Sequence, residues 1–235
     1  MKIEIWSDVM CPFCYIGKRN FETALAQFAD KKHIEVIWKS FQLDPTLSDM
    51  AQESQEDYLI KRKGMSREQV QGLLAHVTNM AKQVGLDYNL EQSVMVNSLK
   101  AHQFIQFAKS KNLGDQAEEH LFKAYFTDGK NIADIATLTQ IGKEIGLDEN
   151  EIHTAFTDDQ YTYMANQDIM EAREIGVSGV PFFVFNRKYA ISGAQPPEVF
   201  LESLEKSFAE WRQQNPENPF EVIKGQSCST DGNCE

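Results

Sequence analysis

The sequence has few cysteines: its 235 residues contain only Cys11, Cys14, Cys228 and Cys234. No cysteine lies between residues 15 and 227, so no disulfide can form within the body of the chain. This distribution excludes the disulfide-rich scaffolds that small secreted domains use. Stability must come from a buried core instead, and a chain of this length is long enough to form one.

Positive charge and long apolar runs are also scarce. Lys and Arg number 23 against 35 Asp and Glu, and the resulting net charge of −12 argues against a nucleic-acid partner. No stretch approaches the ~20 consecutive apolar residues of a membrane helix. Because residues 1–10 also lack the apolar core of a signal peptide, we expect a cytoplasmic protein with no membrane partner, in a compartment where thiols are mostly reduced.

Two of the cysteines form the motif Cys11-Pro12-Phe13-Cys14, which follows a short apolar run and opens a stretch with helical periodicity. At a junction of strand and helix, amide groups and the helix dipole favour an anion such as a thiolate, the nucleophile of disulfide exchange. Half of a zinc site is the alternative for this spacing. The position in the chain favours a redox role, with Cys11 as the exposed attacking thiolate and Cys14 as the resolving thiol.

The elements along the chain predict an interrupted α/β domain. Residues 2–7 and 34–41 have the composition of buried strands with a helix between them, which is the start of a parallel unit. Residues 48–174 carry helical patterns, and we predict roughly five or more helices there. Strand character returns at residues 181–185 and 189–193, and a last helix follows. The predicted division is a thioredoxin-like domain (residues 1–47 and 175–212), a helical insertion (48–174) and a polar tail (213–235).

A second motif, residues 176–183, contains Val180-Pro181, and valine before proline favours extended backbone. Together with residues 6–17 and Ser192-Gly193-Ala194-Gln195, this motif resembles the DsbA-like thioredoxin superfamily. More closely, it resembles the cytoplasmic FrnE-like branch of that superfamily. The resemblance extends from residue 1 to about residue 212.

The resemblance implies an α/β fold of the thioredoxin type with a large all-helical insertion, dithiol–disulfide oxidoreductase activity and no bound organic cofactor. The implied partners are protein or small-molecule disulfides and thiols. By position, Cys11 is the nucleophile, Cys14 is the resolving thiol and Pro181 is a cis-proline. A cis bond would let the backbone of Val180 face Cys11 and pair with a substrate chain, which Pro12 and Phe13 would also contact.

Phe13 marks a departure from the strongly oxidising periplasmic members, which carry histidine between the cysteines. A missing cationic neighbour predicts a lower reduction potential. Those members also have signal peptides, and we expect none for this chain. Both departures favour a reductase or isomerase over a dedicated oxidant.

Two other readings stay open. The first is that the chain resembles the kappa-class glutathione transferases and the 2-hydroxychromene-2-carboxylate isomerases, which have a similar fold. These enzymes typically place serine where Cys11 stands. If the chain acted as they do, glutathione would be a co-substrate. Asn97-Ser98 and Ala101-His102 resemble a segment of those relatives and would either line a substrate groove or make helix-surface or core contacts. The other reading is a redox-regulated holdase or metal-binding module that uses the helical insertion as its surface.

Two further features are candidates for redox roles. Asp8 is a candidate proton acceptor for Cys14, and the alternative is a solvated or helix-capping aspartate. Cys228 and Cys234 bracket an Asp-Gly turn in the polar tail and can close a small disulfide ring. They are a candidate second redox pair, and the alternative is an incidental or metal-scavenging tail. The histidines show no ligand spacing, so we predict no metal site.

Overall fold

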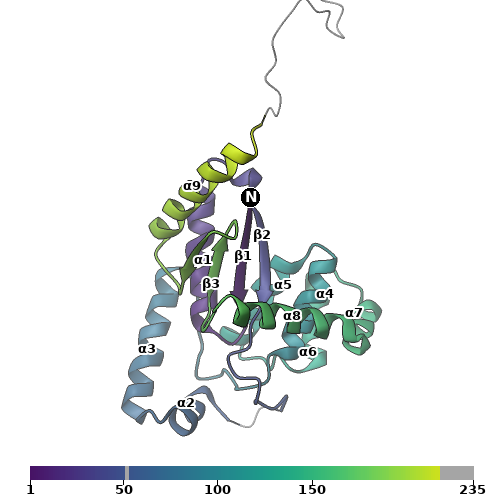
Figure 1. Ribbon diagram of the computed structural model, residues 1–235. Helices are drawn as coiled ribbons and strands as arrows, with labels where there is room; N and C mark the ends of the chain where they lie inside the picture. The colour runs from purple at the N-terminus through teal and green to yellow at the C-terminus, as the bar shows by residue number, and fades with distance from the viewer. Residues whose placement is uncertain (51–52, 218–235) are drawn as a thin grey trace, which may run out of the picture.

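A four-stranded sheet joins the first and last parts of the chain in the computed structural model, which describes residues 1–50 and 53–217 (Figure 1). The strands follow the order β2-β1-β3-β4 across the sheet. β1 pairs in parallel with β2, as the sequence predicted, and antiparallel with β3. The bounds confirm the four expected strands to within one residue at each end: β1 (Lys2–Ser7), β2 (Glu35–Ser40), β3 (Phe182–Phe185) and β4 (Tyr189–Ser192).

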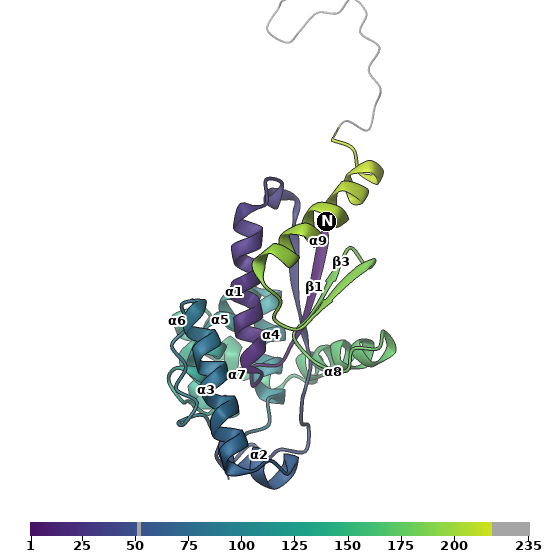
Figure 2. The same ribbon diagram turned by 90° about the vertical axis from the view of Figure 1, so that its left-hand side faces the viewer.

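β1 is an inner strand whose side chains alternate between the two faces of the sheet. One face of the sheet is covered by α1 (Pro12–Gln27) and α9 (Pro197–Gln214) (Figure 2). Ile3 and Ile5 pack there in a core that also contains aromatic side chains of β3 and α9. Trp6 lies on the other face and packs against Ala172. The chain passes from the end of β1 at Ser7 to the start of α1 at Pro12 through a short connection at this edge of the sheet.

A block of seven helices lies between β2 and β3 in the described part of the chain, in agreement with the predicted helical block. Ser66 begins one of them with a capping box, and Asp148 caps another. The exact boundaries of domain, insertion and tail stay a prediction. The seven helices are α2 (Gln55–Lys63), α3 (Arg67–Gln83), α4 (Leu99–Ser110), α5 (Gly114–Phe126), α6 (Ile135–Glu144), α7 (Glu149–Thr157) and α8 (Asp159–Glu174).

The central helix of this block is α4, which contacts α5, α6, α7 and α8. Its buried side chains share one apolar core with those of α5 and with the Cys-x-x-Cys motif. The helical block and the start of α1 are thus packed together rather than separated by a solvent-filled gap. Across residues 1–50 and 53–217, every helix is too short or too polar to span a bilayer.

Candidate active site

The Cys-x-x-Cys motif lies at the junction of β1 and α1, as predicted. Cys11 is the N-cap residue of α1, and Pro12 occupies the first turn, where a missing N–H costs nothing. The Cys11 amide donates a hydrogen bond to the Asp8 carbonyl (2.9 Å), and the Cys14 amide donates one to the Cys11 carbonyl (3.0 Å). Both cysteines are free thiols at the start of a helix, an end where the helix dipole favours negative charge.

The second motif meets the first at the Cys11 thiol. Cys11 Sγ donates a hydrogen bond to the Val180 carbonyl oxygen at 3.3 Å, and the Val180–Pro181 bond is cis, as expected. The expectation of an exposed Cys11 is wrong, because only 4% of this residue is accessible. Its thiol lies beneath Val180 and within the apolar core shared with the helical block.

Gly17, one turn beyond the motif, allows α1 to approach the Pro181 ring. A Cβ atom at this position would lie 3.0 Å from Pro181 Cγ and 3.5 Å from Phe183 Cζ. The contact with Pro181 would be tighter than side chains normally tolerate. The role of Gly17 was missed from the sequence, although a glycine inside a helical pattern is a signal for such a close approach.

Cys14 is almost completely buried behind Cys11. Burial raises the pKa of the Cys14 thiol well above its usual range, and so does its hydrogen bond with Cys11; the Asp8 amide and the Ser7 hydroxyl act in the opposite direction. Cys14 is therefore a neutral thiol at neutral pH. It requires a base before it can act as a nucleophile.

The Asp8 carboxylate is buried under the motif, with 1% of the residue accessible. Its Oδ1 accepts a hydrogen bond from the Met10 amide (3.2 Å), and its Oδ2 accepts one from the Leu43 amide (2.8 Å). It is neither solvated nor a cap of α1, whose N-cap is Cys11 without a side-chain cap bond. These two alternative readings of Asp8 are therefore wrong, while its role as a proton acceptor stays a hypothesis.

The segment around His102 makes core contacts rather than lining a groove. His102 is fully buried in α4, and its Nε2 lies 3.5 Å from Asp8 Oδ1. Asn97 donates hydrogen bonds to the carbonyls of Pro45 (3.1 Å) and Leu47 (3.0 Å), which fixes the loop after β2. The sequence left open whether this segment lines a substrate groove or makes helix-surface or core contacts, and the structure shows core contacts.

Tyr88 supports the motif from the loop after α3. Its hydroxyl donates a hydrogen bond to the Pro12 carbonyl (2.7 Å), and its ring stacks on Phe126 with centroids 4.8 Å apart. Burial raises the pKa of Tyr88, as does its proximity to Cys11 and Cys14, so the hydroxyl stays protonated and remains a donor. No feature of the sequence motif pointed to this residue.

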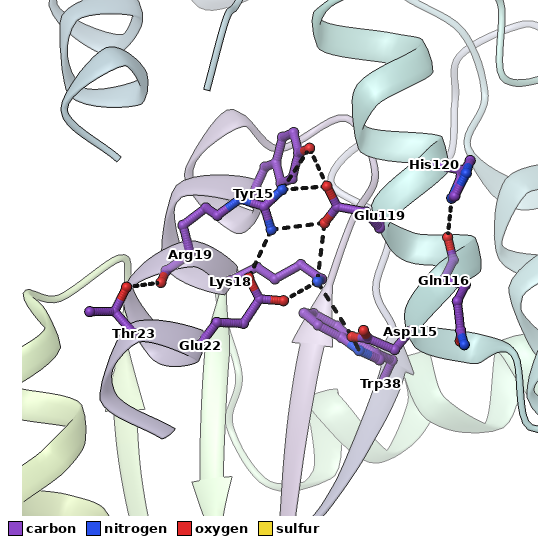
Figure 3. Close-up of polar contacts among 10 residues, drawn as sticks. All are labelled: Tyr15, Lys18, Arg19, Glu22, Thr23, Trp38, Asp115, Gln116, Glu119 and His120. Atoms are coloured by element: carbon purple, nitrogen blue, oxygen red, sulfur yellow. Dashed lines mark hydrogen bonds and ion pairs between the residues drawn. The ribbon is translucent and has the colours of Figure 1, made fainter. Parts of the chain in front are cut away.

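A cluster of charged side chains fixes α1 to α5 (Figure 3). Glu119 of α5 accepts hydrogen bonds from Tyr15 (2.6 Å) and Arg19 (2.9 Å) and pairs with the buried Lys18 (3.1 Å). Burial alone would raise the pKa of Glu119, but the hydrogen bonds from Arg19 and Tyr15 and the charge of Lys18 lower it to about 2. Glu119 therefore stays ionised, and the cluster holds the active-site helix in a fixed orientation against the helical block.

An open cleft of about 220 Å³ lies beside the motif. Pro12 lines it, as expected for a substrate contact, whereas Phe13 is half-buried against the apolar core and is not among the described residues that line it. The cleft is mostly apolar and carries one basic side chain, that of Lys63, and one acidic side chain, that of Asp44. Its lining consists of Met10, Pro12, Leu43, Asp44, Gln55, Tyr58, Leu59, Lys63 and Met95.

The hypothesised second redox pair, Cys228 and Cys234, lies outside the described residues. Its pairing and its position relative to Cys11 and Cys14 therefore stay a prediction from the sequence.

The chain is similar to known proteins over most of its length. The uncharacterised protein YwbO of Bacillus subtilis is 28% identical over 207 residues, which cover 86% of this chain and 94% of YwbO. The crystal structure of a probable DsbA oxidoreductase from Streptomyces coelicolor is 32% identical, with a TM-score of 0.85 and coverage of 100% of this chain and 98% of that chain. The cytosolic disulfide reductase DsbM of Pseudomonas aeruginosa shares the fold at 15% identity, with a TM-score of 0.64 and coverage of 89% and 100%.

These similarities confirm the expected α/β fold of the DsbA-like type, while the assignment to the FrnE-like branch stays a prediction. The DSBA-like thioredoxin domain matches residues 2–205. The chain therefore belongs to the family of DSBA-like thioredoxin domains.

Proposed function

We propose that this protein is a cytoplasmic thiol–disulfide oxidoreductase that reduces or isomerises disulfides of polypeptides, with Cys11 as nucleophile and Cys14 as resolving thiol. One observation carries the proposal. The Cys11 thiol lies at the start of α1, 3.3 Å from the carbonyl that precedes Pro181, with a second free thiol one turn further along the helix. This arrangement supplies a sulfur nucleophile at a helix N-terminus, a backbone acceptor for a substrate chain and a resolving group.

The proposed reaction transfers two electrons from the enzyme dithiol to the substrate disulfide. The Cys11 thiolate attacks one substrate sulfur, an enzyme–substrate disulfide forms, and the other substrate sulfur leaves as a thiolate that takes a proton from water. Cys14 then loses its proton and attacks Cys11 Sγ. The Cys11–Cys14 disulfide forms, and the second substrate sulfur leaves as a thiol after protonation. Isomerisation uses the same first step, followed by attack of another substrate thiol.

The Val180 carbonyl would act in both states of this cycle. In the resting dithiol it accepts the hydrogen bond of the Cys11 thiol. Once Cys11 is bonded to substrate, this thiol hydrogen is gone and the carbonyl becomes free to accept an N–H of the bound polypeptide. Backbone pairing of this kind recognises extended chains with little dependence on their sequence.

Asp8 is the proposed acceptor of the Cys14 proton. Two backbone amides fix its buried carboxylate beside the residue that precedes the motif, and the buried Cys14 thiol requires a base. Glutathione is the proposed small-molecule co-substrate, since it is a peptide with free carboxylates and Lys63 lies on the cleft beside Pro12. DsbM, which is described as a cytosolic disulfide reductase and was also solved with glutathione, supports both the reducing direction and this choice.

Reduction of insulin disulfides by the full chain tests the proposal. We expect Cys11→Ser to abolish turnover, whereas Cys14→Ser should accumulate covalent enzyme–substrate adducts detectable by mass spectrometry. Equal turnover in wild type and Cys11→Ser would refute the proposal. A Cys11→Ser variant that gains activity with glutathione and an electrophilic substrate would instead support the transferase or isomerase alternative.

A further inference from the structure

The cleft beside the Cys-x-x-Cys motif is lined by both chain neighbours of the nucleophilic cysteine. Met10 precedes Cys11 and Pro12 follows it, and both line this cleft of about 220 Å³. The rest of the lining includes Leu43 of the segment after β2 and Leu59 of α2. A group bound in the cleft would therefore lie next to the sulfur that a substrate disulfide must reach.

Leu43 presents an apolar side chain to solvent from a fixed main chain. The residue is 49% accessible. Its amide donates a hydrogen bond to Asp8 Oδ2 (2.8 Å), and the Phe41 amide donates one to the Ser7 carbonyl (2.9 Å). Single exposed leucines are common on protein surfaces. This one belongs to a mostly apolar cleft, and its fixed main chain reduces the entropy that binding would cost.

The charged side chains of the cleft are engaged with other groups of the protein. The Asp44 carboxylate accepts hydrogen bonds from the Tyr58 hydroxyl (2.9 Å) and the Thr46 amide (3.0 Å). The Lys63 ammonium lies over the Tyr58 ring, 5.7 Å from its centroid. The surface that remains for a ligand is therefore mainly that of the apolar side chains.

Asp8 connects two walls of the cleft. Its Oδ1 accepts the hydrogen bond of the Met10 amide (3.2 Å), and its Oδ2 accepts that of the Leu43 amide (2.8 Å). The two residues come from different segments of the chain, and both line the cleft. One buried carboxylate thus fixes the backbone on both sides. Neither hydrogen bond involves a cysteine, so this role is separate from proton transfer.

We propose that the cleft binds an apolar side chain next to the half-cystine of a polypeptide substrate, and that Asp8 is the positioning residue that holds Met10 and Leu43 in place. The inference rests on the proposed oxidoreductase function and adds a sequence preference to the backbone pairing at Val180. The volume suits one side chain, since an apolar cavity of about 150 Å³ in a protein binds benzene. The open cleft of about 220 Å³ therefore holds one aliphatic or aromatic group.

The test follows the attack by Cys11 alone. The parent protein is the full-length chain with Cys14→Ser, Cys228→Ser and Cys234→Ser, so the resolving step and its proton transfer take no part. The substrates are the blocked peptides Gly-Leu-Cys-Leu-Gly and Gly-Ser-Cys-Ser-Gly, each as a mixed disulfide with 2-nitro-5-thiobenzoate. Attack by Cys11 bonds the peptide sulfur to the enzyme and releases the coloured thiolate. Identical residues on both sides of the peptide cysteine make the result independent of chain direction.

The measured quantity is the ratio of the two second-order rate constants, each divided by that of the same peptide with dithiothreitol. We expect the parent protein to prefer the leucine peptide about tenfold. Leu43→Ser should lower this ratio to about threefold or less, whereas Leu43→Met should keep it. Met170→Ser changes an exposed apolar side chain of α8 outside the cleft lining and is the matched control, which should also keep the ratio.

Asp8→Asn should lower the ratio as well. A carboxamide has only one oxygen, and its NH₂ group would face one of the two amides that Asp8 now accepts. Asp8→Ser provides a second measurement if Asp8→Asn does not fold. Folded Asp8 variants that slow both peptides equally would keep the ratio, and this result would overturn the positioning role of Asp8.

A ratio near one in the parent protein would overturn the proposed binding of an apolar side chain, and so would a ratio that Leu43→Ser leaves unchanged. Both results would leave the oxidoreductase assignment intact, because Cys11 would still react. Absence of reaction with either peptide would instead refute the proposed oxidoreductase function itself.

Discussion

Cys11 and Val180 are 169 positions apart in the chain, yet the thiol of one donates a hydrogen bond to the carbonyl of the other at 3.3 Å. Neither motif can make this contact alone. α1 sets the position of Cys11, and the pairing of β3 with β1 sets the position of Val180. The candidate site therefore depends on the completed sheet as much as on the Cys-x-x-Cys motif.

Gly17→Ala should disturb this contact from the side of α1. The added methyl would lie 3.0 Å from Pro181 Cγ, so α1 or the Pro181 loop must shift. We expect a loss of about 1–3 kcal/mol in the free energy of unfolding and slower insulin reduction. Gly72→Ala is the matched control, since nothing lies within 4 Å of its added Cβ. The control should gain ~0.5–1 kcal/mol. Equal effects at the two positions would show that the contact with Pro181 is unimportant.

Tyr88→Phe should weaken the support of the motif. The variant removes the donor to the Pro12 carbonyl while the ring can keep its stacking on Phe126. Loss of a buried hydrogen bond predicts about 1–2 kcal/mol lower stability in urea unfolding. Tyr163→Phe changes an exposed tyrosine of α8 and should leave the stability unchanged. A Tyr88→Phe variant as stable as this control would contradict the role assigned to the hydroxyl.

Glu118→Gln should change how stability depends on pH. Burial raises the pKa of Glu118 in the folded state from 4.5 to about 7, so the folded protein holds this proton more tightly than the unfolded chain. The tighter binding of this proton adds to the free energy of unfolding below pH 4.5, and this contribution is lost as the pH rises through 7. The stability of the variant relative to wild type should therefore rise by roughly 3 kcal/mol between pH 4.5 and pH 8.

Urea unfolding of Glu118→Gln across this pH range measures the effect. Glu202→Gln on the exposed face of α9 is the control and should follow wild type at every pH. A constant difference between Glu118→Gln and wild type would show that the carboxyl does not titrate in this interval.

The tail cysteines should form a disulfide of their own. In the Cys11→Ser/Cys14→Ser variant under oxidising conditions, we expect thiol titration to find no free thiol and disulfide mapping to find a Cys228–Cys234 link. Removal of residues 226–235 should lower insulin turnover about twofold or more if the pair passes electrons to the motif. Unlinked cysteines together with unchanged turnover would remove the second redox pair from the mechanism.

Local patterns predicted most of the fold, because strands and helix starts depend on neighbouring residues. The apolar run of β1 is an example, and its strand was found at the expected residues. The cis bond at Val180–Pro181 could not be predicted from the dipeptide, which favours trans in general. It followed from the resemblance to a known family.

The buried part of the site was harder to predict because it depends on contacts between distant elements. Cys11 was expected to be exposed, but accessibility is decided by Val180 and the helical block rather than by the motif. His102 and Glu118 lie on helices whose patterns only indicate a buried face. The approach of His102 to Asp8 follows from tertiary packing, which no local pattern specifies.

The position of β1 between β2 and β3 has a consequence for synthesis on the ribosome. Ile3 and Ile5 of β1 pair with Phe185 and Phe183 of β3, which are synthesised much later. One edge of β1 therefore stays unpaired until most of the chain has left the ribosome. Late pairing of this kind slows folding and exposes nascent chains to aggregation. The Cys11 sulfur also stays uncovered during this interval, so newly made chains should be the form most easily trapped by thiol-reactive compounds in the cell.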